Sequence, residues 1–424
     1  MRWIALVVVC AGCDHLFDIH SIDIPNTDAV VASDVVPPSD GQNTGHCSAM
    51  TMLADDFTID DLATMWPQTT TLGSNQIAVT GGRLEIRNLT AGSYATLDAG
   101  LFYDLRETSF AAAITDDGAV DDNDFVQLEM VSSTGYDLKI VRTNQTVQVT
   151  ETPATNVPKQ LATFPYVANA MKYFRVAELG GTMTVDTSPD GISYTPQATI
   201  PDPENWAFAR PSIQTHRGTS SPQYTAYVDD VNGGTPSGSA CPIAQLRDDF
   251  SAPALGSQWA NSEAYGGSLT VHDGIADLAS DGAGTIALGS STVYDLRGDV
   301  VFVEVPAIAA SAMANSVELR VTTATGDKLQ WFQSQGTLTS AAVANGASTS
   351  SVLLYSPTAM RWWKIGFTNG TLGWATSADG LTWQNAAAQP PSLSGLDRVD
   401  VRFIVTSNTG VASDTHVDNV NVHP

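Results

Sequence analysis

The chain has 424 residues, of which 43% are hydrophobic and 15% are charged, and its formal net charge is −26 from 45 acidic and 19 basic residues. This composition is typical of a folded protein, and the length allows more than one domain. Such an acidic chain would repel a polyanion, and its lysines and arginines are scattered singly along the sequence. Both features argue against nucleic acid as a partner.

The chain begins with MRWIALVVVCAGCD, which resembles a bacterial lipoprotein signal. Arg2 supplies a positive charge, residues 3–9 are apolar, and two small residues precede Cys13. The apolar run is too short for a membrane-spanning helix, which needs about 20 residues. The resemblance predicts a signal peptide over residues 1–12 and a lipid on Cys13. Cys10 departs from the family pattern, which usually has leucine there, and a buried strand or an uncleaved anchor is the alternative.

Residues 13–46 are rich in Asp, Ser, Pro and Asn, which predicts a disordered tether behind the lipid anchor. We therefore expect the membrane as a partner, and localisation in the bacterial cell envelope, at the outer membrane or cell surface. Two cysteines, Cys47 and Cys241, follow the tether. In an oxidising compartment they are candidates for a disulfide, and two free buried thiols are the alternative.

The remainder of the chain contains one pattern twice. Phe57 is followed nine residues later by Trp66, and Phe250 is followed nine residues later by Trp259. Four further matches keep the same order: YDLR at 103–106 and 294–297, MKYFRV at 171–176 and MRWWKI at 360–365, TSPDGISY at 187–194 and TSADGLTW at 376–383, and YVDDV at 227–231 and HVDNV at 416–420. The repetition predicts two tandem domains, over residues 47–236 and 241–424.

Each copy is predicted to consist of antiparallel strands. Residues 126–130 and 317–321 alternate between apolar and polar side chains, and Gly, Asn, Asp, Ser and Pro separate many such short runs. Alternation with period two is typical of a sheet with one buried face. We find no long helical pattern, so the predicted fold class is all-β, with two β-sandwiches in tandem.

The Asp-Gly pairs in TSPDGISY and TSADGLTW predict hairpin turns. A type I′ turn needs positive φ at both central residues, which Asp tolerates and Gly favours. We expect Val185 to pack against Tyr194 across the first hairpin, and Trp374 against Trp383 across the second. The predicted role of both stretches is structural rather than chemical.

The order Asp-Asp-Phe, Trp, Tyr-Asp-Leu-Arg, Arg-Trp-Trp-Lys-Ile, Asp-Gly and Val-Asp-Asn-Val resembles the concanavalin A-like, laminin G-like jelly rolls of bacterial exported proteins. The resemblance covers residues 55–231 and 248–420. It implies a two-sheet sandwich in each copy. Members of that superfamily bind sugars or proteins, serve in adhesion, or hydrolyse glucans.

Catalytic residues are not indicated. The glucanases of that superfamily carry Glu-x-Asp-x-x-Glu on one strand, whereas Glu129 and Glu318 each stand alone on theirs. Hydrolysis of a glycosidic bond needs two carboxyl groups facing one sugar. None of the seven histidines forms His-x-His or His-Glu-x-x-His, so the sequence also lacks a zinc motif.

Calcium is the one cofactor that the sequence leaves open. First and last strands of a jelly roll often lie side by side, which would bring Asp56 to Asp229 and Asp249 to Asp418. The acidic stretch 116–124 is a second candidate. Solvated turn carboxylates that bind no metal are the alternative for both.

Aromatic residues beside basic ones are the candidates for ligand binding. Trp362 shares a strand face with Lys364, and Tyr173 shares one with Arg175. Each ring is either exposed for a sugar or covered in a second layer. The predicted function is a non-catalytic envelope lipoprotein whose lectin-like domains bind glycan or a surface protein. A structural or adhesive spacer and a glycan-acting enzyme with an atypical site are the alternatives.

Overall fold

Most of the chain after residue 46 is described by a computed structural model. The described residues are 47–59, 62–116, 124–153, 157–201, 206–219, 221–235, 237–308, 315–344, 346–389, 393–407 and 413–424. The predicted signal peptide (1–12), the lipidation candidate Cys13, the tether (13–46) and residues 117–123 of the acidic stretch lie outside them. No helix among the described residues has the length and apolar character needed to cross a membrane.

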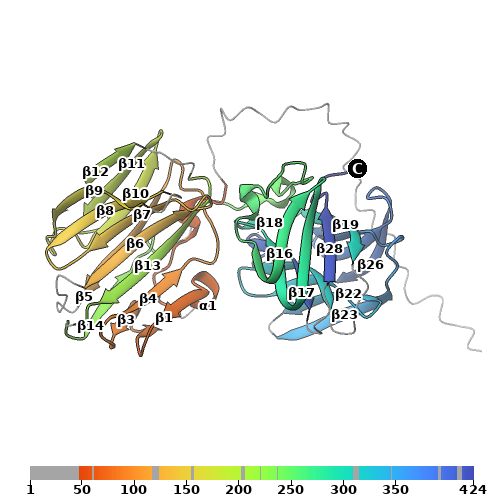
Figure 1. Ribbon diagram of the computed structural model, residues 1–424, viewed down its shortest axis with the longest axis horizontal. Helices are drawn as coiled ribbons and strands as arrows, with labels where there is room; N and C mark the ends of the chain where they lie inside the picture. The colour runs from red at the N-terminus through yellow and green to blue at the C-terminus, as the bar shows by residue number, and fades with distance from the viewer. Residues whose placement is uncertain are drawn as a thin grey trace, which may run out of the picture. The chain divides into compact units, whose positions relative to one another are not determined.

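Two antiparallel sheets of seven strands enclose one apolar core in the first half of the described chain, residues 47–235 (Figure 1). One has the order β1-β4-β13-β6-β7-β8-β9 and the other β12-β11-β10-β5-β14-β3-β2. The elements are η2 (Met50–Met52), α1 (Leu62–Met65), β1 (Gln68–Thr71), β2 (Gln76–Val79), β3 (Leu84–Asn88), β4 (Ser93–Asp98), β5 (Ser109–Asp116), β6 (Phe125–Ser132), β7 (Asp137–Arg142), β8 (Thr146–Thr152), β9 (Lys159–Pro165), β10 (Tyr173–Leu179), β11 (Thr182–Ser188), β12 (Thr195–Pro201), β13 (Ala209–Arg217) and β14 (Tyr224–Asp229).

In the second half, residues 241–424, the strands of the two layers join into one continuous sheet. Strand β17 is long enough to pair with β28 through its first part and with β27 through its last part. The matching strands of the first half, β3 and β4, are separate. The elements are β15 (Cys241–Pro242), η3 (Ile243–Gln245), η4 (Ser257–Trp259), β16 (Glu263–His272), β17 (Ile275–Gly289), β18 (Tyr294–Asp295), β19 (Asp299–Ile308), β20 (Ser316–Thr323), β21 (Lys328–Ser334), β22 (Thr337–Ala344), β23 (Ala347–Leu354), β24 (Trp362–Thr368), β25 (Thr371–Ser377), β26 (Trp383–Gln389), β27 (Val399–Ser407) and β28 (Ser413–Asp418).

The predicted all-β fold class is confirmed, and the period-two pattern explains it. Val126, Leu128 and Met130 point from β6 into the core, while Glu129 lies on the outward face opposite Ser212 of β13. Burial of such apolar rows is worth about 25 cal/mol per Å², which favours the sandwich over a single exposed sheet.

The repeated Asp-Asp-Phe and Trp landmarks make the same contacts in both halves. Asp55 Oδ2 accepts a hydrogen bond from the indole of Trp66 at 3.0 Å, and Asp55 Oδ1 accepts one from Phe57 N at 2.7 Å. Asp248 Oδ2 accepts from the indole of Trp259 at 2.7 Å. Phe57 and Phe250 both have left-handed backbone, with φ of 51° and 50°. The first carboxylate of each motif therefore shapes a turn and satisfies a buried indole.

Asparagines at the two ends provide a second shared contact, which the sequence did not indicate. Asn232 Nδ2 donates to the backbone carbonyls of Met50 and Leu53, at 2.9 Å and 2.7 Å. Asn421 Nδ2 donates in the same way to Ile243 O and Leu246 O, both at 2.9 Å. Each asparagine thus ties the end of its half to the 3₁₀ turn at the start of that half.

Candidate functional site

Cys47 and Cys241 form a disulfide with a Cα–Cα distance of 4.8 Å and a sequence separation of 194. The neighbouring Ser48 hydroxyl donates to Val293 O at 2.7 Å. The bond joins the start of the first half to the start of the second, and its cysteines are committed to a structural role.

Each Asp-Gly stretch forms a loop that the aspartate closes, not a type I′ hairpin turn. Gly191 and Gly380 have positive φ, at 72° and 75°, but the aspartates before them do not. Asp379 Oδ1 accepts from Leu381 N at 2.9 Å and from Thr382 N at 2.7 Å. These hydrogen bonds lower the pKa of Asp379 to about 2, because they favour the ionised form.

The expected pairs across these loops do not form. Val185 lies opposite Ala198, and Trp374 lies opposite Ala387. The prediction of Val185–Tyr194 and Trp374–Trp383 pairs was wrong. Even a two-residue turn would place Val185 opposite Pro196 and Trp374 opposite Asn385, and the longer loop with its bulge shifts the register by two further residues. The predicted structural role of the stretches agrees with the hydrogen bonds to the aspartate.

The Asp-Gly loops cover the two aromatic candidates for ligand binding. Trp362 is 2% exposed and Tyr173 is 9% exposed. A Cβ on Gly380 would lie 2.8 Å from the Trp362 ring, and one on Gly191 would lie 2.9 Å from the Tyr173 ring. The sequence left each ring either exposed or covered, and in the structure both rings are covered. Neither ring therefore offers a flat surface to a sugar.

The basic partners of those rings are also engaged. Arg175 forms an ion pair with Asp186 at 2.6 Å and lies 3.9 Å above the ring of Tyr194. Lys364 Nζ lies 4.0 Å from the ring centre of Trp383. Cation–π contacts of this kind hold each cation against its own sheet. The candidates Tyr173, Arg175, Trp362 and Lys364 therefore stabilise their own halves.

The calcium candidates are brought near one another at the ends of each half. Asp55 bridges to Val231 and Asp248 bridges to Val420, which brings Asp249 toward Asp418. Burial raises the pKa of Asp418 to about 6, and the charges of Glu304 and Asp249 add to the rise. In the first half burial raises the pKa of Asp229, with smaller contributions from Asp230 and Asp56.

Neither aspartate pair belongs to a group of three metal-ligating side chains among the described residues. Asp56 Oδ1 accepts from Thr58 N and Thr58 Oγ1, at 3.0 Å and 2.7 Å. Calcium takes about six to eight oxygen ligands. Two carboxylates supply only part of such a shell, so these pairs are weak candidates for a metal site.

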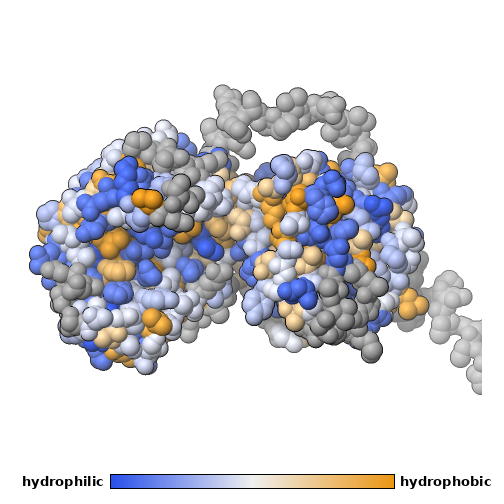
Figure 2. Space-filling model, in the orientation of Figure 1, coloured by the Kyte–Doolittle hydropathy of each residue, from blue (hydrophilic) through white to orange (hydrophobic). Residues whose placement is uncertain are grey.

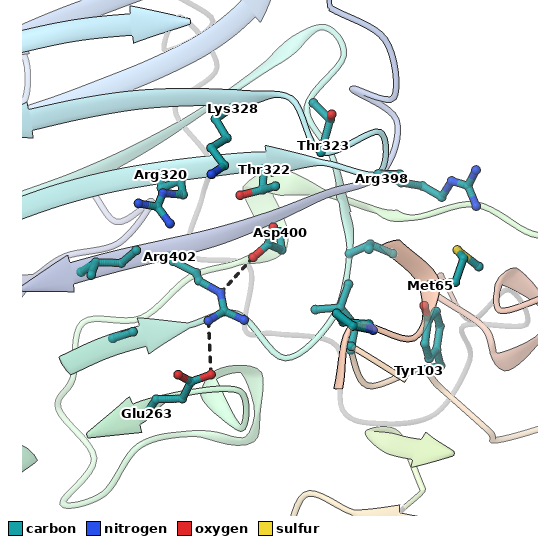
Figure 3. A pocket seen from close by; sticks show the side chains of 18 of the residues that line it. Met65, Tyr103, Glu263, Arg320, Thr322, Thr323, Lys328, Arg398, Asp400 and Arg402 are labelled. Carbon is teal, nitrogen blue, oxygen red and sulfur yellow. Dashed lines mark hydrogen bonds and ion pairs between the residues drawn. The ribbon is translucent and has the colours of Figure 1, made fainter. Parts of the chain in front are cut away.

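A cavity of about 600 Å³ lies over the outward face of strands β20, β27 and β21 (Figure 3). Four basic residues line it: Arg320, Lys328, Arg398 and Arg402. The strand register explains how they meet, since Arg320 lies directly opposite Arg402 and Thr322 lies opposite Asp400. Met65 and Tyr103 of the first half line the cavity as well.

Carboxylates hold two of these four cations. Arg402 bonds to Asp400 at 3.1 Å and to Glu263 at 3.4 Å (Figure 3). Arg320 forms two hydrogen bonds to Glu318, at 2.7 Å and 2.5 Å. Burial raises the pKa of Asp400, although the nearby arginines oppose that rise. These acids therefore serve mainly to fix the arginines in the sheet.

Lys328 and Arg398 form no ion pair with any residue that the structure describes. Burial raises the pKa of Tyr103 to about 12, and the charge of Arg398 acts in the opposite direction. The cavity thus presents four bases and two acids in a protein whose net charge is −26. In the sequence these bases look scattered, and only the register of β20, β21 and β27 brings them together.

The visible surface around the sheets is mostly hydrophilic, with hydrophobic residues in small separate groups (Figure 2). The cavity is the candidate functional site because four basic side chains gather in its lining.

No family model and no curated protein matches the chain. Among solved structures, the legume lectin-like domain from Entamoeba histolytica is similar at 12% identity over 42% of this chain and 94% of that one, with a TM-score of 0.33. The Emp47p carbohydrate recognition domain shares 13% identity over 45% and 99%, with a TM-score of 0.32. SCLam, an endo-β-1,3(4)-glucanase from family GH16, shares 9% identity over 41% and 88%, with a TM-score of 0.34. These similarities are too distant to assign a function to the chain.

Proposed function

We propose that this protein is a non-catalytic binding protein of the bacterial cell envelope, held by a lipid on Cys13, whose cavity takes an acidic glycan. The observation that carries the proposal is the gathering of Arg320, Lys328, Arg398 and Arg402 around one cavity of an acidic protein. A positive electrostatic potential in a concave site favours a ligand that carries carboxylate or sulfate groups.

The geometry supports a glycan rather than a small anion. A cavity of about 600 Å³ accommodates more than one sugar unit. Thr322 and Thr323 line it beside the bases, and hydroxyl groups both donate and accept hydrogen bonds, as sugar hydroxyls do. Lys328 and Arg398 are the two cations with no ion pair among the described residues, so we expect them to bind the anionic group.

The surroundings of the acids support a role without catalysis. A glycosidase needs one protonated and one ionised carboxyl group on either side of the scissile bond. Asp400 and Glu263 both bind Arg402, and Glu318 binds Arg320. Each of these three carboxylates is thus held by an arginine of the sheet, and no two of them are arranged on either side of an open position for a scissile bond.

The experiment is titration calorimetry of the full chain with uronate-containing oligosaccharides and with neutral oligosaccharides of equal length. We expect the acidic ligand to bind, with affinity that falls as salt rises. Lys328→Gln and Arg398→Gln should each weaken binding by about tenfold, the effect of one charge-assisted hydrogen bond. Lys139→Gln is the matched control, because Lys139 lies on the corresponding sheet of the first half and is paired with Glu129 at 2.9 Å.

Other outcomes would overturn the proposal. Equal affinity for acidic and neutral ligands would show that charge does not determine binding. Unchanged affinity in both variants would show that the ligand binds outside the cavity. Release of new reducing ends during incubation would favour the glycan-acting enzyme, and Glu263→Gln would then be the first variant to assay. If no oligosaccharide binds, a protein ligand or a spacer without ligand becomes the better hypothesis.

A further inference from the structure

A second group of polar side chains lies on the outward face of β16, β17 and β28, outside the cavity lining. Asp277 of β17 lies directly opposite His416 of β28. Asp414 precedes His416 by two residues and therefore shares its face. His272 ends β16, two residues after Thr270, which pairs with Asp277. Register alone thus places two imidazoles and two carboxylates on one side of the sheet.

The ligand atoms of three members of this group lie close together, and His272 lies beside one of the three, Asp277. His416 Nε2 is 3.5 Å from Asp414 Oδ2 and 3.9 Å from Asp277 Oδ1. One ligand atom from each of Asp277, Asp414 and His416 lies within 4.8 Å of the other two. His272 Nε2 is 3.4 Å from the other oxygen of Asp277. Ligand atoms around tetrahedral zinc are separated by about 3.3 Å, given bond lengths of about 2.0–2.1 Å.

One oxygen of the group is buried without a hydrogen bond, and its ion-pair partner, His416 Nε2, lies 3.9 Å away. Asp277 Oδ1 is inaccessible to solvent and accepts no hydrogen bond in the structure. The ion pairs described for Asp277 and Asp414 involve histidines, and none of them involves a lysine or arginine. A buried carboxylate oxygen is costly unless a cation or a donor faces it. The position facing Asp277 Oδ1 is therefore suited to a metal ion.

The matching position of the first half has its own cations. Glu85 of β3 lies opposite Tyr227 of β14, as Asp277 lies opposite His416. Arg87 binds Glu85 at 3.0 Å, and Arg83 lies 3.5 Å from Glu85 and 3.7 Å above the ring of Tyr227. In the second half Ala279 takes the place of Arg87, since both lie two residues beyond the matched acid on their strands. The second half has no arginine at the two matching positions and has imidazoles and a further carboxylate nearby instead.

We propose that His416, Asp277 and Asp414, with His272 as fourth ligand, bind a divalent transition metal of the zinc class. Two imidazole nitrogens with carboxylate oxygens form a donor set that zinc accepts, and that calcium and magnesium, which prefer oxygen ligands, do not. The sequence lacks a zinc motif because the ligands come from three strands, and only the strand register brings them together.

The experiment is zinc titration of the full chain after chelator treatment, by calorimetry and by thermal unfolding. We expect one class of site for zinc, a rise in Tm that grows with zinc concentration, and the visible absorption of four-coordinate cobalt when Co²⁺ replaces zinc. His416→Ala and Asp414→Asn should each weaken zinc binding by at least about tenfold. His423→Ala is the matched histidine control and should bind zinc as the parent chain does.

Asp414→Asn also keeps the test decisive if the alanine variant unfolds, because it preserves shape while removing charge. Circular dichroism without metal should show each variant folded. Zinc affinity unchanged in both site variants would overturn the proposal, and so would calcium binding in preference to zinc. Loss of zinc binding in His423→Ala would move the site elsewhere and would equally overturn it.

Discussion

Glu85 in the first half and Asp277 in the second occupy the same place in the strand register, yet their surroundings differ. Arg83 and Arg87 accompany Glu85, whereas His416 and Asp414 accompany Asp277. Near the start of each half the surroundings are instead the same, because Asp55 and Asp248 make the same hydrogen bonds to the backbone and to an indole. The contacts that shape the backbone near the starts of the two halves are therefore the same, whereas the outward-facing partners of this one acid on the sheet, Glu85 or Asp277, differ.

The largest expected effect tests the contacts that recur. Asp55→Ala and Asp248→Ala should each lower the free energy of unfolding by about 2–4 kcal/mol, because each leaves a buried indole N–H without an acceptor and frees a left-handed turn. Denaturant unfolding of the two variants measures this. A large loss for one and none for the other would show that the two motifs are not equivalent.

The two ring-covering glycines provide an intermediate test. Gly380→Ala should cost about 1–3 kcal/mol, because its φ is 75° and a Cβ would lie 2.8 Å from the Trp362 ring. Gly191→Ala should cost a similar amount of stability, because a Cβ there would lie 2.9 Å from the Tyr173 ring. Gly370→Ala has the same φ of 75° and open space around its Cβ, so it isolates the backbone cost. If all three variants lose equal stability, the ring contact contributes nothing.

A third test concerns pH. The pKa of Asp418 is raised from 3.8 to about 6 in the folded protein, so the folded state binds more protons than the unfolded state between those values. Stability therefore falls as pH rises from about 4 to about 6. Asp418→Asn should raise Tm at pH 7, and the gain should disappear near pH 4. Thermal unfolding across that pH range is the measurement.

Asp229→Asn in the first half should show the same trend, because burial also raises the pKa of Asp229. A gain in Tm that is independent of pH would contradict the assignment to ionisation. A calcium-dependent rise in Tm that Asp418→Asn abolishes would instead favour the calcium site predicted for Asp249 and Asp418.

The sequence predicted what depends on neighbours along the chain. Alternation in β6 and β20 indicated the sheets, and the repeated Asp-Asp-Phe and Trp residues indicated matched turns. The turn type at Asp379 was missed, because the aspartate side chain replaces a backbone hydrogen bond and lengthens the loop.

The candidate site depends on distant strands, and there the sequence was less informative. Arg320 and Arg402 are far apart along the chain and meet only through the pairing of β20 with β27. Whether Trp362 faces solvent was decided by a loop from another hairpin, through Gly380. Periodicity assigns a face to a side chain but does not say what covers that face.

The disulfide between Cys47 and Cys241 has a mechanical consequence. Because it spans the whole first half, a pull on the residues before Cys47 reaches Cys241 through the sulfur atoms and then enters the second half. The first half lies within the loop closed by the disulfide and therefore carries none of the applied force. When the oxidised chain is pulled from its two ends, the second half should unfold and the first half should stay folded, and adding a reductant should let the first half unfold as well.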